Sequence, residues 1–331
     1  MESTVVVLNW NGRKVLPRCL ESLSRQSSDS FQLVVVDNGS TDGSADEIRK
    51  CYYKPCEIIR LPHNMGFSKA NNIALRGVTT PYVALLNNDA FPEPDWLESL
   101  VAALQKYPEA GFAASKLLFD NARNIIDRAG DGYTTAGAAY LRGRGAQSSQ
   151  YHEEEMVFGA CAAAALYRTE MLRSIGLFDE DFFLLHEDVD LSFRAQLMRY
   201  RCVYVPQAVA YHRASSTLVH DSSTSVYFGH RNLEWVYVKN MPWTLLARTF
   251  WQHLLYDLLA CAFFLRIGMG RDFIRAKKHA MAQLPVMWKK RKRIQALRTV
   301  SDRYIAGLLE RESFLQRYRS RGRGEGLRSE D

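Results

Sequence analysis

The first 120 residues alternate short apolar runs with segments of helical spacing, and this alternation constrains the fold more than any other feature of the sequence. The apolar runs are rich in β-branched and aliphatic residues, as buried strands are. They span residues 4–8, 31–36, 56–61 and 82–86. The helical segments span residues 14–25, 43–51, 68–77 and 94–107. Short strands that alternate with helices predict an α/β fold with a mainly parallel, Rossmann-like central sheet flanked by helices.

The pattern is less regular after residue 120. Glycines are frequent in residues 120–155, which predicts a hairpin or a mobile excursion. Residues 157–167 are small and apolar, as in a buried strand that passes close to a ligand or to another backbone segment. We expect a helix near residues 188–199 and a strand at 202–205 that ends at Pro206, after which residues 209–212 could continue the sheet.

A polar loop rich in Asn, Asp, Gly and Ser follows each of the four predicted strands. The loops are Asn9-Trp10-Asn11-Gly12, Asp37-Asn38-Gly39-Ser40, the segment 63–72, and Asn87-Asn88-Asp89. These residue types also favour turns and helix N-caps, so one such loop alone would indicate little. In open parallel sheets, however, ligands bind beyond the carboxyl ends of the strands. Four such loops at one edge of the sheet therefore favour a shared polar site.

Two carboxylates directly follow predicted strands. Asp37 is placed where it can accept hydrogen bonds from a nucleobase or from a ribose hydroxyl. Asp89 lies beside two amides, which suits Mg²⁺ or Mn²⁺ bound together with diphosphate oxygens. The alternative for Asp89 is that it caps the helix predicted near residue 94.

An acidic cluster, His186-Glu187-Asp188-Val189-Asp190, follows the apolar run 182–185. An apolar wall raises the proton affinity of a carboxylate and suits a general base. The alternative is an acidic helix N-terminus, which the helix dipole favours. His212 ends a later apolar run and could complete a metal site near Asp89 or contact a diphosphate, although a lone histidine is more often structural.

The positive charge is concentrated in the C-terminal part of the chain. Residues 1–270 contain 26 Lys+Arg and 29 Asp+Glu, whereas residues 271–331 contain 17 and 7. The preceding apolar run, 243–267, is interrupted by charged residues and is too polar to span a bilayer comfortably. We predict a helix that lies on an anionic membrane surface. The alternatives are packing on the catalytic domain and a homodimer interface.

The six cysteines form no C-x-x-C pair, which favours free thiols over a disulfide framework or a zinc site. The N-terminal segment lacks the pattern of a signal peptide and is instead expected to form the first strand. We therefore expect a cytoplasmic protein, peripheral on the inner face of the cell membrane.

Five motifs, in this order, resemble those of glycosyltransferase family 2. Within that family they are most similar to the rhamnosyltransferase-like bacterial subgroup. They are LNWNG (8–12), VVVDNGSTDGS (34–44), LPHNMGFSKANNIAL (61–75), LLNNDAFPEPDWL (85–97) and GLFDEDFFLLHEDVDLSFR (176–194). The resemblance covers about residues 4–240. It implies a GT-A fold, a dTDP- or UDP-sugar donor, a divalent metal (Mg²⁺ or Mn²⁺), and inverting transfer of rhamnose or another hexose to a glycan or lipid-linked acceptor in cell-surface polysaccharide assembly.

The resemblance also implies roles for individual residues of the donor site. Those expected to bind the nucleoside, ribose or diphosphate are Asn9, Asn11, Asp37, Asn64, Gly66, Asn71, Asn72 and Asn88.

The metal and catalytic residues follow from the same resemblance. Asp89 matches the last position of the family's D-x-D metal motif, and His212 matches a histidine near the metal. Asp188 matches the catalytic base, with Glu187 beside it. The first D-x-D position departs from the pattern, because Asn87 stands there and leaves one negative charge fewer for the metal.

We expect a catalytic domain over residues 1–225, with a nucleotide-sugar half to about residue 120 and an acceptor half after it. An amphipathic, basic helical extension over 226–318 and a disordered tail over 319–331 would follow.

Two other functions were weighed against glycosyl transfer. A sugar nucleotidyltransferase should carry a glycine-rich phosphate loop after the first strand, and residues 9–13 contain little glycine. A non-catalytic protein associated with membranes or nucleic acid would leave the carboxylates unexplained. We expect no nucleic-acid partner.

Overall fold

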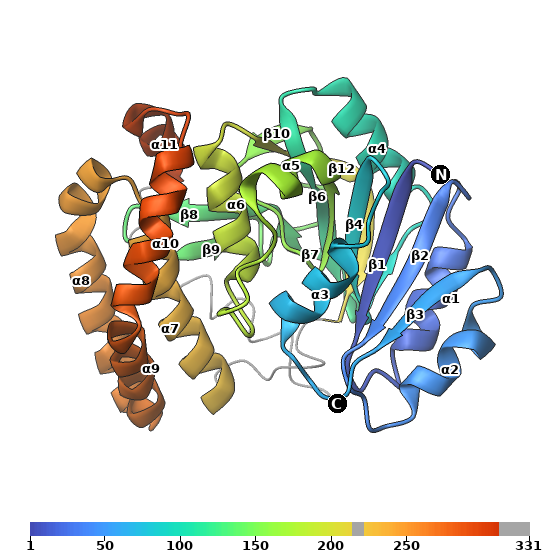
Figure 1. Cartoon of the computed structure of the whole chain (residues 1–331), viewed down its shortest axis with the longest axis horizontal. Coiled ribbons are helices and arrows are strands. Elements are labelled where there is room, and N and C mark those ends of the chain that lie inside the picture. The colour runs from blue at the N-terminus through green and yellow to red at the C-terminus, as the bar shows by residue number, and fades with distance from the viewer. Residues whose placement is uncertain (214–221, 311–331) are drawn as a thin grey trace.

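The structure, a computed structural model, describes residues 1–213 and 222–310. The predicted disordered tail, 319–331, and the end of the predicted extension, 311–318, lie outside these residues. The described chain is built around a ten-stranded sheet (Figure 1). Its strands are β1 (Ser3–Asn9), β2 (Phe31–Asp37), β3 (Cys56–Arg60), β4 (Tyr82–Asn87), β5 (Ala90–Pro92), β6 (Ala110–Phe119), β7 (Ala122–Ala129), β10 (Glu155–Val157), β11 (Ala164–Arg168) and β12 (Arg201–His212). Their order is β10-β12-β6-β11-β4-β1-β2-β3, with β5 beside β12 and β7 beside β6.

The sheet is mixed, and strands β1 to β4 form the parallel, Rossmann-like part that the sequence predicts. Strand β1 pairs in parallel with β2 and β4, and β2 pairs in parallel with β3. Strand β11 runs antiparallel to both β4 and β6, and β12 runs parallel to β6. Consequently β12, β6, β4, β1, β2 and β3 all point the same way. Their carboxyl ends meet at one edge of the sheet, where the polar loops begin.

Three features of the sheet differ from the sequence-based expectation. Strand β6 was not predicted; it is rich in alanine, which has a weak strand preference, but all of its residues are buried. The predicted strand 157–167 is instead the end of β10 and the start of β11, separated by residues 158–163. Strand β12 continues past Pro206 because its register with β6 shifts between Val205 and Val209, and strand prolines are tolerated at such bulges.

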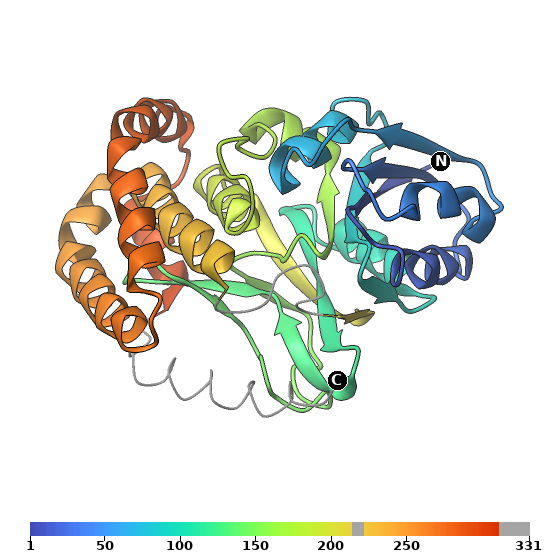
Figure 2. The ribbon, with the colours of Figure 1, turned by 90° about the horizontal axis from the view of Figure 1, so that it is seen from below.

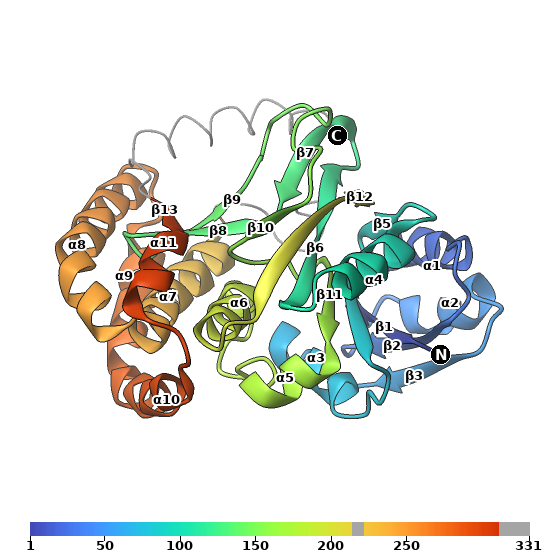
Figure 3. The same ribbon diagram turned by 90° about the horizontal axis from the view of Figure 1, so that it is seen from above.

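Residues 120–155 form hairpins, as one of the two expectations for this region proposed. Strand β7 folds back against β6. Strands β8 (Asp131–Thr134) and β9 (Ala139–Leu141) pair antiparallel and form a small sheet with β13 (Leu309–Glu310). Figure 3 shows β8 and β9 reaching from the large sheet toward the C-terminal helices.

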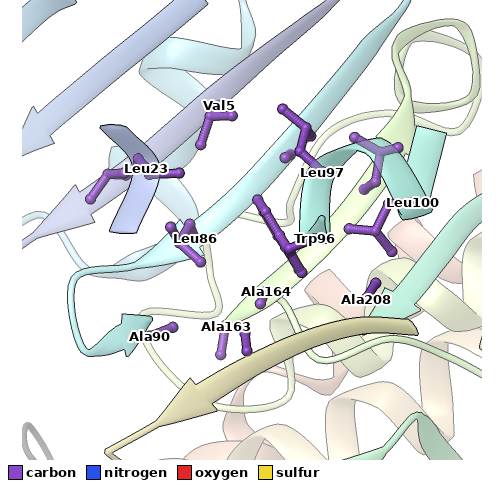
Figure 4. Close-up of a cluster of buried hydrophobic side chains, with 14 of the residues drawn as sticks. Val5, Leu23, Leu86, Ala90, Trp96, Leu97, Leu100, Ala163, Ala164 and Ala208 are labelled. Atoms are coloured by element: carbon purple, nitrogen blue, oxygen red, sulfur yellow. The ribbon is translucent and has the colours of Figure 1, made fainter. Parts of the chain in front are cut away.

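Helices cover both faces of the large sheet. One face is covered by α1 (Leu16–Ser24), α2 (Ser44–Cys51) and α4 (Trp96–Lys106). The other face is covered by α3 (Phe67–Leu75), α5 (Thr169–Ile175) and α6 (Glu187–Leu197). In the first layer Trp96 is fully buried among aliphatic side chains such as Leu100 (Figure 4), and its indole N–H donates to Ser115 Oγ at 2.8 Å. Burial of this large ring anchors α4 on the sheet.

Five further helices gather at the end of the molecule away from β1–β3 (Figures 1 and 2). They are α7 (Ser223–Asn240), α8 (Trp243–Arg266), α9 (Gly270–Ala282), α10 (Leu284–Leu297) and α11 (Asp302–Leu308). A third apolar cluster joins Tyr133 of β8 and Phe193 of α6 to Trp235 of α7 and Met287 of α10. The C-terminal helices therefore share a core with the rest of the chain.

A buried ionic network also joins α6 to α7. The Asp190 carboxylate is fully buried and accepts hydrogen bonds from Arg194 Nε at 2.9 Å and from Asn240 Nδ2 at 2.8 Å. Lys239 Nζ lies 2.9 Å from the same carboxylate and also pairs with Asp179. Two buried cations therefore depend on Asp190.

We predict that Asp190→Ala destabilises the protein by about 3–5 kcal/mol, because breaking a buried ion pair leaves uncompensated charges in the core. Urea unfolding followed by circular dichroism measures this change. The matched control is Glu47→Ala, which breaks the solvent-exposed Glu47–Lys50 pair and should cost less than about 1 kcal/mol. Equal effects of the two substitutions would contradict a structural role for the network.

Candidate active site

The predicted site residues fall into four groups along the carboxyl edge of the sheet. The first group lies at the ends of β1, β2 and β4. Asn9 is fully buried, and its Nδ2 donates to Asp37 Oδ1 and to Ser44 Oγ, each at 2.9 Å. Its Oδ1 accepts from Asn88 Nδ2 at 2.8 Å. The structure thus brings Asn9, Asp37 and Asn88 together, and the Asn9 amide holds the other two side chains in place.

Asn11 lies at the exposed rim of this first group. Its backbone adopts φ 49°, and its N–H donates to Ser40 Oγ at 2.9 Å. Its Oδ1 accepts from the N–H of Thr41 at 2.9 Å. These bonds tie the loop after β1 to the loop after β2, so both loops are fixed relative to Asp37.

The second group joins α3 and its preceding loop to the segment before α6. Asn64 Oδ1 accepts from the N–H of Gly66 at 2.8 Å. Gly66 adopts φ +80°, and a Cβ there would lie 2.5 Å from the carbonyl oxygen of Phe183, so this position requires glycine. The structure therefore places the loop expected at the ribose and diphosphate directly against the segment that leads to Asp188.

The two asparagines of α3 make bonds within the protein. Asn72 exchanges two hydrogen bonds with the backbone of Phe178, at 2.8 and 3.0 Å. Asn71 Nδ2 donates to the carbonyl of Phe67 at 3.0 Å. Asn72 therefore ties α3 to Phe178, the Asn71 bond lies within α3 itself, and a direct contact of either side chain with the donor stays a prediction.

The third group is the expected metal site, formed by Asp89 after β4 and His212 at the end of β12. His212 pairs with Ala90 in the sheet, so the two side chains meet although they are far apart in sequence. His212 Nε2 lies 3.6 Å from Asp89 Oδ1, and both side chains are largely buried.

Asp127 was missed by the sequence analysis and completes this group. It lies on β7, and its Oδ2 is 2.8 Å from Nδ1 of His212, while its other oxygen pairs with Arg144. When one imidazole nitrogen of a histidine binds a metal, the other nitrogen usually makes a hydrogen bond, often to a carboxylate. Asp127 therefore fixes the direction in which Nε2 points.

The charges in this group are balanced. Burial raises the pKa of Asp127, but Arg144 and His212 outweigh burial and hold it below its usual value. Burial lowers the pKa of His212, but Asp89 and Asp127 raise it to about 9 overall. The imidazolium therefore lies between two carboxylates at neutral pH. The Asp89 carboxylate fits Mg²⁺ or Mn²⁺, and the imidazole nitrogen of His212 favours Mn²⁺ of the two; a bound ion would displace the proton on Nε2.

The fourth group surrounds the N-terminus of α6. Asp188 is half-buried; its Oδ1 accepts from the N–H of Val189 at 2.8 Å and its Oδ2 from the N–H of Ala162 at 3.3 Å. Glu187 is buried, and burial, reinforced by the charge of Asp188, raises the pKa of Glu187 well above its usual value. Asp188 is therefore the more accessible carboxylate of the motif.

Asp131, Cys161 and Asp188 form a cluster whose ligand atoms all lie within 4.8 Å of one another, a spacing that could hold a metal ion. Two observations argue against that use. Burial raises the pKa of the Cys161 thiol well above its usual value, and a neutral thiol is a poor ligand. Arg128 NH1 also lies 3.3 Å from both oxygens of Asp131 and already supplies a positive charge. The Asp89–His212 pair is therefore the better candidate.

Burial raises the pKa of Asp131; Arg128 opposes this shift, the nearby Asp188 adds to it, and the result is about 6. Asp131 therefore titrates near neutral pH beside the candidate base. Asp127, Arg128 and Asp131 all lie in residues 120–155, the region that the sequence analysis found irregular. The signal that could have found them is a pair of charged residues set between Ile126 and Ala129, because charges within an apolar strand need partners.

The comparisons with known proteins agree on one family. The model of glycosyl transferase family 2 matches residues 4–176. The chain is 27% identical, over 278 residues, to the N-acetylglucosaminyl-diphospho-decaprenol L-rhamnosyltransferase of Mycobacterium tuberculosis, a match that covers 73% of this chain and 88% of that protein. It is 40% identical over 89 residues to the teichoic acid poly(glycerol phosphate) polymerase of Staphylococcus epidermidis, but that match covers 26% of this chain and only 12% of the polymerase.

The fold is also shared with solved glycosyltransferases. The mannosyltransferase PcManGT of Pyrobaculum calidifontis, in complex with GDP-Man and Mn²⁺, superposes with a TM-score of 0.53 at 17% identity, over 93% of this chain and 85% of that one. This likeness confirms the predicted GT-A fold. The family model spans more than half of the chain, so this protein belongs to glycosyltransferase family 2.

Proposed function

We propose that this protein transfers a hexose, of which rhamnose is the first candidate, from a dTDP- or UDP-sugar to a hydroxyl of a glycan or lipid-linked acceptor in cell-surface polysaccharide assembly. The observation that carries the proposal is that the Asp89–His212 pair, the Asn9–Asp37–Asn88 group and Asp188 lie along one edge of the sheet. Two similar proteins support a role in cell-surface polysaccharide assembly, because their names place them in decaprenyl-diphosphate glycan and teichoic acid synthesis.

The donor would bind along the carboxyl ends of β1, β2 and β4. Asp37 would accept hydrogen bonds from the base or ribose, and Asn9 holds its carboxylate in place. Asp89 and His212 would hold Mg²⁺ or Mn²⁺, which supplies positive charge to the leaving diphosphate. Asn87 adds no charge here, so His212, oriented by Asp127, takes on more of the binding.

Asp188 is the proposed base. It takes the proton from the acceptor hydroxyl as that oxygen attacks the anomeric carbon. The bond from this carbon to the diphosphate breaks, and its electron pair leaves with the nucleoside diphosphate. Direct displacement inverts the anomeric configuration and requires no nucleophile from the protein. Glu187 is buried beside this base, and burial raises the pKa of Glu187 well above its usual value.

We predict that Asp188→Asn lowers the transfer rate by about 10²–10⁴-fold, the usual cost of losing a general base. Donor affinity, measured by calorimetry, should stay nearly unchanged. Glu187→Gln should cost much less, because the Glu187 carboxyl is buried and Asp188 is the more accessible of the two. An Asp188→Asn enzyme that keeps more than half of its activity would place the base elsewhere.

The metal assignment predicts a graded series of variants. Asp89→Asn should abolish measurable Mn²⁺ binding, and Asp127→Asn should weaken it by about 10–100-fold, because outer partners of metal ligands contribute that much. Paramagnetic resonance of free Mn²⁺, in the presence of donor, measures both without relying on turnover. Full activity of the unmodified protein in excess chelator would reject the site.

The reaction itself is tested by release of nucleoside diphosphate from a panel of dTDP- and UDP-sugars. We expect a product of anomeric configuration opposite to that of the donor, which proton NMR of the fresh product reports. Retention of the donor's anomeric configuration would reject the assignment of Asp188 as the sole catalytic base. Release of pyrophosphate would favour a nucleotidyltransferase, and no turnover with any donor or acceptor would favour a non-catalytic role.

A further inference from the structure

Helix α8 exposes a broad apolar face. Trp251 is 73% exposed and Leu258 is 60% exposed, both far above what apolar side chains of this size usually show. The exposed apolar side chains include Trp243, Phe250, Trp251, Leu255, Leu258 and Leu265. At about 100° per residue these positions lie on one side of the helix. Figures 1 and 3 show α8 at the outer edge of the molecule, away from the large sheet.

The opposite side of α8 is the one that packs on the protein. Phe264 is buried against Phe273 of α9. His253 stacks on Tyr237 with ring centroids 3.9 Å apart, and its Nε2 is 3.0 Å from Glu234. These contacts fix the rotation of α8 about its own axis. The exposed apolar face is therefore distinct from the face by which α8 packs on the protein.

The C-terminal residues of the chain are poorly suited to cover this face. Residues 311–331 contain only four large apolar residues, Phe314, Leu315, Tyr318 and Leu327, among many charged ones. Within residues 1–213 and 222–310, no helix is long and apolar enough to cross a membrane. A helix of this kind, apolar along one side and charged at the edges, instead suits the plane of a membrane surface.

The charge around the face is strongly positive. Residues 243–310 contain 13 Lys+Arg and 4 Asp+Glu. Two of the four acids are paired within the protein, Asp257 with Lys277 and Asp302 with Arg298. Arg248 and Arg266 are both exposed and lie 18 residues apart, which is five helical turns or about 27 Å, so they border the apolar face on the same side.

We propose that α8 docks this protein on an anionic lipid bilayer, with its apolar face between the headgroups and Arg248 and Arg266 on their phosphates. Exposed basic residues of α9 and α10, such as Lys278 and Lys292, add to the attraction. The docking rests on the proposed function in one respect: its purpose is to bring the active site to a lipid-linked acceptor. Charge favours lipid over a second copy of the chain, because two such surfaces would bring like charges together.

The test is sedimentation of the full chain with phosphatidylcholine vesicles that contain or lack phosphatidylglycerol. We expect binding only to the anionic vesicles, and less of it at high salt because salt screens the charges. Leu255→Glu with Leu258→Glu should weaken binding at least about tenfold, since it places charge in the inserted face. The control is Tyr53→Glu, at a 92% exposed aromatic residue of the nucleotide half, which should bind like the unmodified protein.

Reversing the charge of basic side chains tests the docking independently of the apolar face. Arg248→Glu with Arg266→Glu should weaken binding at least about 25-fold, because each basic side chain near an anionic leaflet contributes about fivefold. Arg49→Glu with Lys50→Glu, on the exposed side of α2, changes the net charge equally and should have little effect. Thermal unfolding confirms that each variant is folded.

Two results would overturn the docking surface. One is absence of binding to anionic vesicles at low salt. The other is a dimer in solution that the Leu255→Glu, Leu258→Glu variant dissociates, which would identify a second copy as the occupant. Release of nucleoside diphosphate from the donor panel is measured on the same samples. Turnover without vesicle binding rejects the docking alone, and vesicle binding without turnover rejects the proposed function alone.

Discussion

Buried carboxylates gather at the carboxyl edge of the central sheet, and each must be paired or neutral because an isolated charge is costly away from water. Asp127 pairs with Arg144 and His212, and Asp131 with Arg128. Asp190 is compensated by Arg194 and Lys239. Glu187 has no such cation among the hydrogen bonds and ion pairs of the described chain, and burial raises the pKa of Glu187 well above its usual value. The need to compensate charge thus links β7 to β12 and α6 to α7.

This compensation also separates the roles of neighbouring acids. Glu187, Asp188 and Asp190 lie within four positions of the chain, yet they differ in burial and partners. Asp190 points into the core toward α7, and Glu187 is buried beside Asp188. Asp188, at the half-buried position between them, accepts hydrogen bonds from the backbone N–H groups of Ala162 and Val189. Burial and hydrogen-bond partners thus distinguish three carboxylates that are close together in the sequence.

The sequence predicted those parts of the fold that depend on local pattern. Strands β1 to β4 were found because each is a short aliphatic run with a polar loop after it. Strand β6 was not, because its alanines favour a strand only when both faces are buried, and burial depends on the whole sheet. The residues alone left the pairing of Asp89 with His212 as one of several alternatives, and the family resemblance favoured it, since 122 positions of chain separate them.

The direction of an amide side chain was beyond sequence reasoning. Asn9 and Asn72 are predicted at the donor, and in the structure their side chains make hydrogen bonds within the protein. A contact with the donor stays a prediction for both. Only the three-dimensional arrangement distinguishes an amide that braces a loop from one that contacts a ligand.

Helix α8 shows the same limit on the opposite side of the molecule. In the sequence, His253 and Asp257 interrupt an apolar run and make it look only moderately amphipathic. In the structure both turn inward, where His253 bonds Glu234 and Asp257 accepts from Lys277 Nζ at 2.5 Å. Glu234, His253 and Asp257 are spaced as metal ligands, but the Lys277 ammonium contacts both carboxylates and balances their charge. The polar residues that interrupt the apolar run of α8 therefore fix the rotation of this helix. Because they face inward, the outward face of α8 is almost wholly apolar.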